Sequence, residues 1–104
     1  MHWAYQKDRW DLNSMIAPLK GRPVYLTFDL DGFDSSLMPA TGTPEPGGLF
    51  WDDAMTIIRK AAENCEIVGA DVNELSPMEN FHAPDFLAAK LVYKILNFAL
   101  CKPR

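Results

Sequence analysis

Two aspartates, Asp29 and Asp31, follow a short apolar stretch of the chain and stand two positions apart. In an extended segment, side chains at i and i+2 point to the same side, so both carboxylates can face one point. Carboxylates held close together repel one another unless a cation neutralises them, and oxygen ligands suit Mg²⁺, Mn²⁺ or Ca²⁺. A divalent metal site is therefore the first chemistry that these residues predict.

A turn is the alternative interpretation of the same two aspartates, because Asp side chains accept hydrogen bonds from nearby backbone N–H groups in loops. This alternative stays open on the residues alone. A calcium loop of the EF-hand type is excluded by its spacing, which requires glycine at the sixth position and glutamate at the twelfth. Counted from Asp29, the glycine Gly32 is fourth and Ala40 is twelfth.

A second group of polar residues, Asp71-Val72-Asn73-Glu74, follows another short apolar segment. The carboxyl ends of parallel strands lie at one edge of a sheet, where ligands of open α/β sheets bind. We therefore expect this group to lie near Asp29 and Asp31.

The elements that position these residues are predicted in the order strand, helix, strand, helix. The predicted strands span 24–28 and 67–70, and the predicted helices span 51–63 and about 84–100. A glycine- and proline-rich connection spans 31–50, and loops of that length inside compact domains are usually functional. Residues 1–20 indicate only a short helix over 8–16, which Pro18 would end.

This order predicts an α/β fold with a parallel sheet and a right-handed crossover. Residues 24–28 are almost all apolar, which indicates a strand covered on both faces. The last helix is apolar around most of its circumference, with only a narrow polar stripe of Lys90, Lys94 and Asn97. Such a helix needs more protein around it than two strands provide, so residues 1–104 are expected to form a single, partial domain.

Composition narrows the classes of function. The 104 residues carry a net charge of −4, which disfavours nucleic acid as a partner. The two cysteines, Cys65 and Cys101, form no metal or disulfide pattern, so a reducing cytoplasm is expected. No stretch has the length and apolarity of a signal peptide or a membrane span.

Three segments of the chain resemble, in order, the signatures of the agmatinase/arginase (ureohydrolase) family. Residues 27–34 read T-F-D-L-D-G-F-D and are similar to its S/T-F-D-I/L-D-G-x-D-P signature. Residues 38–49, M-P-A-T-G-T-P-E-P-G-G-L, resemble its glycine-rich segment, and the T-G-T-P-E-P form is more typical of agmatinase. Residues 68–77, V-G-A-D-V-N-E-L-S-P, resemble its V-G-x-D-V-x-E-x-x-P stretch, and L-A-A-K-L follows at 87–91.

The resemblance implies a role for each matching residue. Asp29 would bridge two manganese ions and Asp31 would chelate one of them. Glu74 would pair with a guanidinium group, because a planar fork of N–H donors matches a carboxylate, and Thr43 would shape the guanidinium pocket. Asp34 is expected to hold the loop rather than to bind metal.

The chain also departs from the family pattern. The D-x-H-x-D segment and the upstream histidine that complete the family's metal site are absent from these 104 residues. Ser35 stands where the signature has proline, and Pro84 stands near a frequent threonine. His82 could shuttle protons, but a lone loop histidine is more often structural or solvated.

Two hypotheses about function follow. The first is manganese-dependent hydrolysis of an agmatine-like guanidino substrate to release urea, performed by the C-terminal β-α-β-α part of a three-layer αβα enzyme. That enzyme would be completed by an N-terminal half or assembled as a homo-oligomer. The alternative is a non-catalytic or degenerate module that associates with other chains or binds metal weakly.

Overall fold

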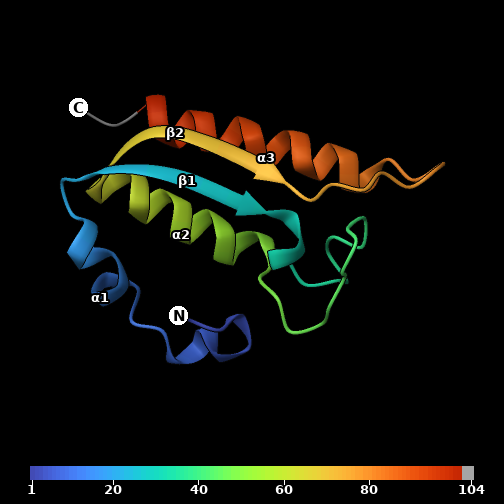
Figure 1. Ribbon diagram of the computed structural model, residues 1–104, viewed down its shortest axis with the longest axis horizontal. Helices are drawn as coiled ribbons and strands as arrows, with labels where there is room; N and C mark the ends of the chain where they lie inside the picture. Colours follow the sequence, from blue (N-terminus) through green and yellow to red (C-terminus); the bar gives the residue numbers. More distant parts are fainter. Residues whose placement is uncertain (102–104) are drawn as a thin grey trace.

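A two-stranded parallel sheet with two helices forms the body of the protein (Figure 1). The computed structural model describes residues 1–101. Strand β1 spans Pro23–Asp29 and strand β2 spans Glu66–Asn73, and helix α2, Trp51–Asn64, connects them. Helix α3, Ala83–Leu100, follows β2. The predicted α/β class, the element order and the parallel sheet are confirmed.

Both long helices pack on the same face of the sheet and form one apolar core with it. The core is closed by side chains with almost no exposed surface, among them Leu30 and Phe33 after β1, Ile58 of α2 and Leu91 of α3. The half-buried Leu26 and Phe28 of β1 pack against this cluster from the sheet. Burial of these apolar side chains is the main force that holds helices and sheet together.

The opposite face of the sheet is uncovered, so the prediction that β1 is covered on both faces is wrong for this chain. Residues of β1 alternate between half-buried and exposed along its whole length, and Tyr25 on the outer face is 60% exposed. The structure therefore has two layers, one of sheet and one of helices. The third layer of an αβα arrangement is not formed by the described residues.

The N-terminal region differs from the single helix predicted over 8–16. It contains a 3₁₀ helix η1 at Ala4–Arg9, a short helix α1 at Leu12–Ile16 and a 3₁₀ turn η2 at Ala17–Leu19. Asp11 begins α1 as its N-cap, because its carboxylate accepts hydrogen bonds from the Ser14 backbone N–H at 3.4 Å and hydroxyl at 2.7 Å. This cap interrupts the region at a position where the sequence pattern predicts continuous helix.

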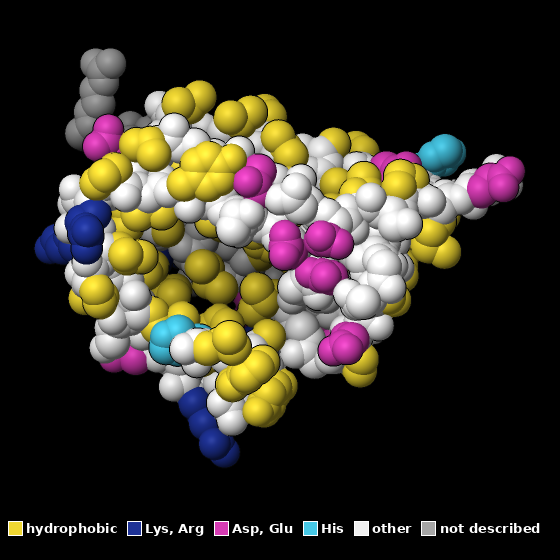
Figure 2. Space-filling model, viewed as in Figure 1, with side chains coloured by type: hydrophobic (Ala, Val, Ile, Leu, Met, Phe, Trp, Pro, Cys, Tyr) yellow, Lys and Arg dark blue, Asp and Glu magenta, His cyan; other side chains and the backbone are white. Residues whose placement is uncertain are grey.

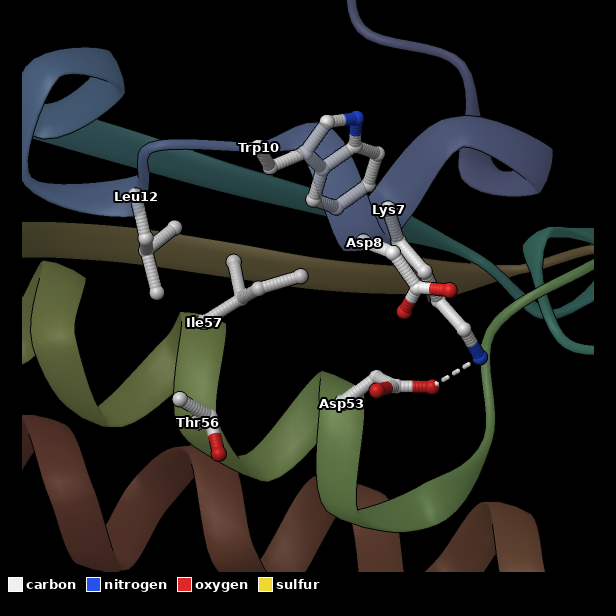
Figure 3. Close-up of a pocket in the computed structure, with 7 residues that line it drawn as sticks. All are labelled: Lys7, Asp8, Trp10, Leu12, Asp53, Thr56 and Ile57. Atoms are coloured by element: carbon white, nitrogen blue, oxygen red, sulfur yellow. Dashed lines mark hydrogen bonds and ion pairs between the residues drawn. The ribbon is translucent and has the colours of Figure 1, made fainter.

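The N-terminal segment is fixed to α2 by Lys7, whose ammonium lies 2.6 Å from the Asp53 carboxylate (Figure 3). The same ammonium lies 4.6 Å from the centre of the Phe50 ring. Asp53 also accepts the Phe50 backbone N–H at 2.8 Å, which satisfies one of the free donors at the start of α2. Burial acts to raise the pKa of Asp53, but its bond to Lys7 and the Phe50 N–H outweigh that effect and lower it. A cleft of about 200 Å³ separates the two elements, and no predicted site residue lines it.

Within the described part of the chain, none of the helices combines the length and the apolarity that crossing a bilayer requires.

Candidate metal and substrate site

The carboxyl ends of β1 and β2 lie side by side, as the sequence predicts. Asp29 is the last residue of β1 and pairs with Asn73, the last residue of β2, so that Glu74 follows immediately at the same edge. Figure 2 shows acidic side chains gathered over this end of the strands. The parallel register thus brings Asp29 and Glu74 to one end of the sheet, although the paired residues Thr27 and Asp71 are 44 positions apart in the sequence.

The backbone around Asp31 is not the extended segment that the i, i+2 spacing predicts. Chain extension ends at Asp29, and residues Leu30–Gly32 form a 3₁₀ turn, η3. Leu30 is completely buried and anchors this turn in the core. Asp29 and Asp31 therefore leave the backbone from a strand end and from a turn, and not from one face of a continuous strand.

Thr43 contacts Asp31 directly. Its hydroxyl donates a hydrogen bond to Asp31 Oδ2 at 3.1 Å, which joins the turn after β1 to the glycine-rich loop. Among residues 1–101, the carboxylate of Asp29 has no hydrogen-bond partner and is exposed. Asp31, a predicted metal ligand, is thus held by Thr43, a predicted pocket residue. Asp29, the other predicted metal ligand, is free to bind a ligand.

Asp34 holds the loop, as expected from the resemblance. Its carboxylate accepts hydrogen bonds from the Ser36 hydroxyl and backbone N–H, and from the backbone N–H groups of Gly47 at 2.8 Å and Gly48 at 3.2 Å. These donors, led by the Ser36 hydroxyl, lower the pKa of Asp34 to about 2. The side chain is therefore committed to the loop and not available as a metal ligand.

Ser35 and Gly48 contribute to the same loop through their backbones. The Ser35 N–H, which the family's proline would lack, donates to the Glu45 carbonyl at 2.9 Å. Gly48 lies so close to the chain after Phe33 that an added Cβ would stand 2.5 Å from the Asp34 nitrogen. The loop is therefore closed on the strand end by contacts that only a glycine at position 48 permits.

Asp71 lies within β2, and not in the loop after a strand at 67–70 as predicted. Its carboxylate accepts hydrogen bonds from the Tyr25 phenol at 3.0 Å, from the Thr27 hydroxyl and from the Asn73 side chain. The Thr27 bond is the main reason that the pKa of Asp71 is lowered, and the bond to Asp71 raises the pKa of Tyr25. This polar network lies on the outer face of the sheet, next to the end of β1 at Asp29.

Sequence reasoning missed Tyr25 and Thr27 as members of this network. A signal existed, because Thr27 stands two positions before Asp29 and therefore on the same face of the strand. The partner Asp71 could not be identified, since the pairing register of two distant strands is not visible in either segment.

Glu74 adopts an unusual backbone conformation at the predicted substrate position. Its φ of 75° is in the left-handed region, which costs a non-glycine residue about 1–3 kcal/mol and is frequent at functional sites. The loop that starts here projects beyond the strand ends (Figure 1) and is tied to the glycine-rich loop by a 2.8 Å bond from the Ser76 N–H to the Ala40 carbonyl. His82 is exposed at the end of this loop and precedes α3.

The carboxyl ends of β1 and β2 provide only some of the ligands that a metal ion needs. Carboxylate oxygens suit Mn²⁺ in kind, and within residues 1–101 neither Asp29 nor Asp31 forms an ion pair. Residues 1–101 contain no group of three or more His, Cys, Asp or Glu side chains that could hold an ion. The buried Thr41 hydroxyl, within the glycine-rich loop, has no hydrogen-bond partner among residues 1–101. The donor set therefore fits part of a metal site.

Comparison with known proteins gives the same assignment as the motifs. The Arginase family model matches residues 3–97. An N(1)-aminopropylagmatine ureohydrolase of Synechocystis is 39% identical over 87 residues, which are 84% of this chain and 28% of that protein. A guanidinobutyrase of Pseudomonas aeruginosa is 44% identical over 77 residues, or 73% of this chain and 24% of that protein.

The fold is found in solved structures of the same group. A hypothetical agmatinase from Burkholderia thailandensis superposes with a TM-score of 0.78 at 32% identity, over 92% of this chain and 32% of that one. The chain thus spans about a third or less of the proteins it matches. The family match extends over nearly all of its residues, and we conclude that this chain belongs to the arginase family.

Proposed function

We propose that this chain forms one wall of a manganese-dependent active site that hydrolyses an agmatine-like guanidino compound and releases urea. The observation that carries the proposal is the parallel register of β1 and β2, which brings Asp29 and Glu74 to one edge of the sheet. The remainder of the site would come from the part of the fold that the relatives have and the described residues do not form.

Asp29 and Asp31 would hold the metal in this proposal. Their oxygen donors match the preference of Mn²⁺, and the hydrogen bond from Thr43 would orient the Asp31 carboxylate, as partners of metal ligands generally do. When bound, a pair of divalent ions lowers the pKa of water and supplies a nucleophile for the guanidinium carbon at neutral pH.

Glu74 would bind the substrate. A carboxylate accepts two parallel N–H bonds from a guanidinium group, which fixes both its position and its plane. The left-handed backbone of Glu74 supports this role, because strained non-glycine residues persist where function requires one side-chain direction. No catalytic role is proposed for His82: it is exposed beyond the same loop, as a solvated histidine is, and a proton shuttle remains the less favoured interpretation.

The guanidinium group defines the proposed class of substrate. The relatives are named for different compounds, aminopropylagmatine and guanidinobutyrate among them. The shared chemistry is the guanidinium group, so an agmatine-like compound is the proposed substrate class.

A non-catalytic module is the second candidate. It is favoured by one observation, that Asp29 and Asp31 are not joined by a third ligand in the part of the chain that the structure describes. In that case the chain would keep the fold and associate with other chains through its uncovered surfaces.

Complementation separates the two candidates. The chain is mixed with the hypothetical agmatinase of Burkholderia thailandensis from which the matching third has been deleted, and urea release from agmatine is measured with and without Mn²⁺; the undeleted protein is the positive control. Restored, manganese-dependent release is expected.

Glu74→Gln should lower kcat/KM by about 10- to 100-fold, since a hydrogen bond to a charged group is worth about 1.5–3 kcal/mol. Glu79→Gln, in the same loop, is the matched control. A folded complex that releases no urea would support the non-catalytic module.

A further inference from the structure

The carboxyl end of β2 carries a polar residue, Asn73, that the proposed metal and substrate chemistry does not use. It is the last residue of β2 and pairs in register with Asp29, the last residue of β1. Both residues are exposed. Neighbouring strands lie about 4.7–4.9 Å apart, and paired residues of a parallel sheet project to the same face. The side chains of Asn73 and Asp29 are therefore neighbours on the outer face of the sheet.

The carboxamide of Asn73 is anchored to Asp71. Its Nδ2 atom donates a hydrogen bond to Asp71 Oδ1. An ionised carboxylate only accepts hydrogen bonds, so the nitrogen of the carboxamide, and not its oxygen, has to face Asp71. The partner thus fixes which way round the Asn73 carboxamide lies.

Asp71 is itself held in place from the neighbouring strand. The Tyr25 phenol donates to its Oδ2 atom at 3.0 Å, and the Thr27 hydroxyl donates to its Oδ1 atom. Tyr25 can reach Asp71 because its ring lies over Gly69, where an added Cβ would stand 2.8 Å from the ring. With Asn73, three donors from two strands converge on one carboxylate, so the support of the Asn73 carboxamide is itself fixed.

We propose that Asn73 is a positioning residue for Asp29. One N–H of its carboxamide stays on Asp71, and the second N–H is donated to the Asp29 carboxylate when that carboxylate holds a metal ion. The inference rests on the proposed function, in which Asp29 is a metal ligand. Carboxylates that bind metal are generally fixed by a hydrogen-bonded partner behind them, and loss of that partner weakens metal binding.

Asn73 has the donor capacity that this role requires, and the other donors near Asp29 are engaged. A carboxamide nitrogen carries two N–H groups, and the bond to Asp71 uses one of them. The Thr27 hydroxyl is given to Asp71 and the Thr43 hydroxyl to Asp31. A bond from Asn73 would occupy one side of the Asp29 carboxylate and leave its remaining lone pairs for the ion.

Hydrogen-bond scalar couplings in NMR spectra of the isotope-labelled chain test the bridge, with Mg²⁺ as a diamagnetic probe. A coupling from Asn73 Nδ2 to the Asp71 carboxyl carbon is expected with and without Mg²⁺. A second coupling, to the Asp29 carboxyl carbon, is expected once Mg²⁺ shifts the Asp29 resonance. A shifted Asp29 resonance without that coupling overturns the inference and leaves Asp29 as a metal ligand. An Asp29 resonance that Mg²⁺ does not shift contradicts the proposed metal site as well as the bridge.

Mn²⁺ titration of a matched pair of variants measures what the bridge contributes. Asn73→Leu, which is close in size but has no N–H group, should raise the dissociation constant for Mn²⁺ at Asp29 about tenfold. Asn97→Leu makes the same change at an exposed position of α3 and should leave that constant unchanged. Circular dichroism checks that both variants are folded, and the couplings are read in the unmodified chain. Equal Mn²⁺ affinities for the two variants overturn the inference.

Discussion

The hydroxyl of Thr43 donates a hydrogen bond of 3.1 Å to the carboxylate of Asp31, and so connects the glycine-rich loop to the turn after β1. A residue that orients a metal ligand typically changes metal affinity about 10- to 100-fold when it is replaced. We predict that Thr43→Val weakens Mn²⁺ binding at Asp31 by about tenfold, whereas Thr43→Ser, which keeps the hydroxyl, does not. Paramagnetic broadening of the Asp29 and Asp31 resonances during a Mn²⁺ titration measures this. Equal titration curves for both variants would show that Thr43 does not orient Asp31.

Stability in acid should depend on Asp34. Its pKa is about 2 in the folded chain and near 3.8 when unpaired, so the ionised form is favoured by folding. The contribution is complete above about pH 4 and is lost as the pH falls towards 2. Asp34→Asn should lower the urea midpoint at pH 6 and flatten its fall between pH 4 and 2. The control Glu79→Gln should show the same pH profile as the unmodified chain; a profile for Asp34→Asn that is equally steep would contradict the assignment.

Gly48 is required by the close approach of two chain segments. An added Cβ would meet backbone atoms of Phe33 and Asp34 at 2.5–2.8 Å, and backbone cannot move aside as a side chain can. Gly48→Ala should therefore destabilise the protein by about 1–3 kcal/mol. At Gly42 nothing lies within 4 Å, so Gly42→Ala should change stability by less than about 1 kcal/mol. The free energy of unfolding from urea titration compares the two variants, and equal losses would show that the loop closes differently.

The phenol of Tyr25 should report the network on the outer face of the sheet. Its hydrogen bond to Asp71 raises the pKa of Tyr25 above 10.0, because ionisation of the phenol would place a second negative charge beside the carboxylate. Asp71→Asn removes that charge, and the pKa should then fall towards 10. Ultraviolet titration of Tyr5→Phe/Tyr93→Phe, which leaves only this tyrosine, follows the change. An unchanged titration after Asp71→Asn would mean that the bond is not formed in solution.

The elements that position the site follow from the sequence because their signals are local. Helix α2 has Asp52 and Asp53 at its start and an apolar face with Ile58, and it forms within one residue of its predicted end. Helix α3 tolerates Pro84 in its first turn, as predicted. Strand order and the closeness of Asp29 to Glu74 follow from the parallel α/β pattern.

Other features depend on long-range contacts and were not predictable. The turn that holds Asp31 forms because Leu30 enters the core, and the spacing of the two aspartates contains no information about that. The apolar residues of β1 indicate a strand covered on both faces, yet Tyr25 is exposed. The composition of the strand suits a larger fold, and the described residues form only part of it. Strand β2 extends to Asn73 because residues 71–73 pair with residues 27–29 of β1, and this register is not visible in either segment alone.

The network that joins Tyr25 to Asp71 spans 46 positions of the sequence. Contacts of such sequence separation form only after a long intervening segment has closed, which slows folding. No short segment of this chain can hold Asp29 and Glu74 together by itself. The residues next to them are brought together only by the pairing of β1 with β2. Slow amide hydrogen exchange in β1 and β2 should therefore proceed through opening of the whole protein, and the candidate site should have no partly folded state in which it survives.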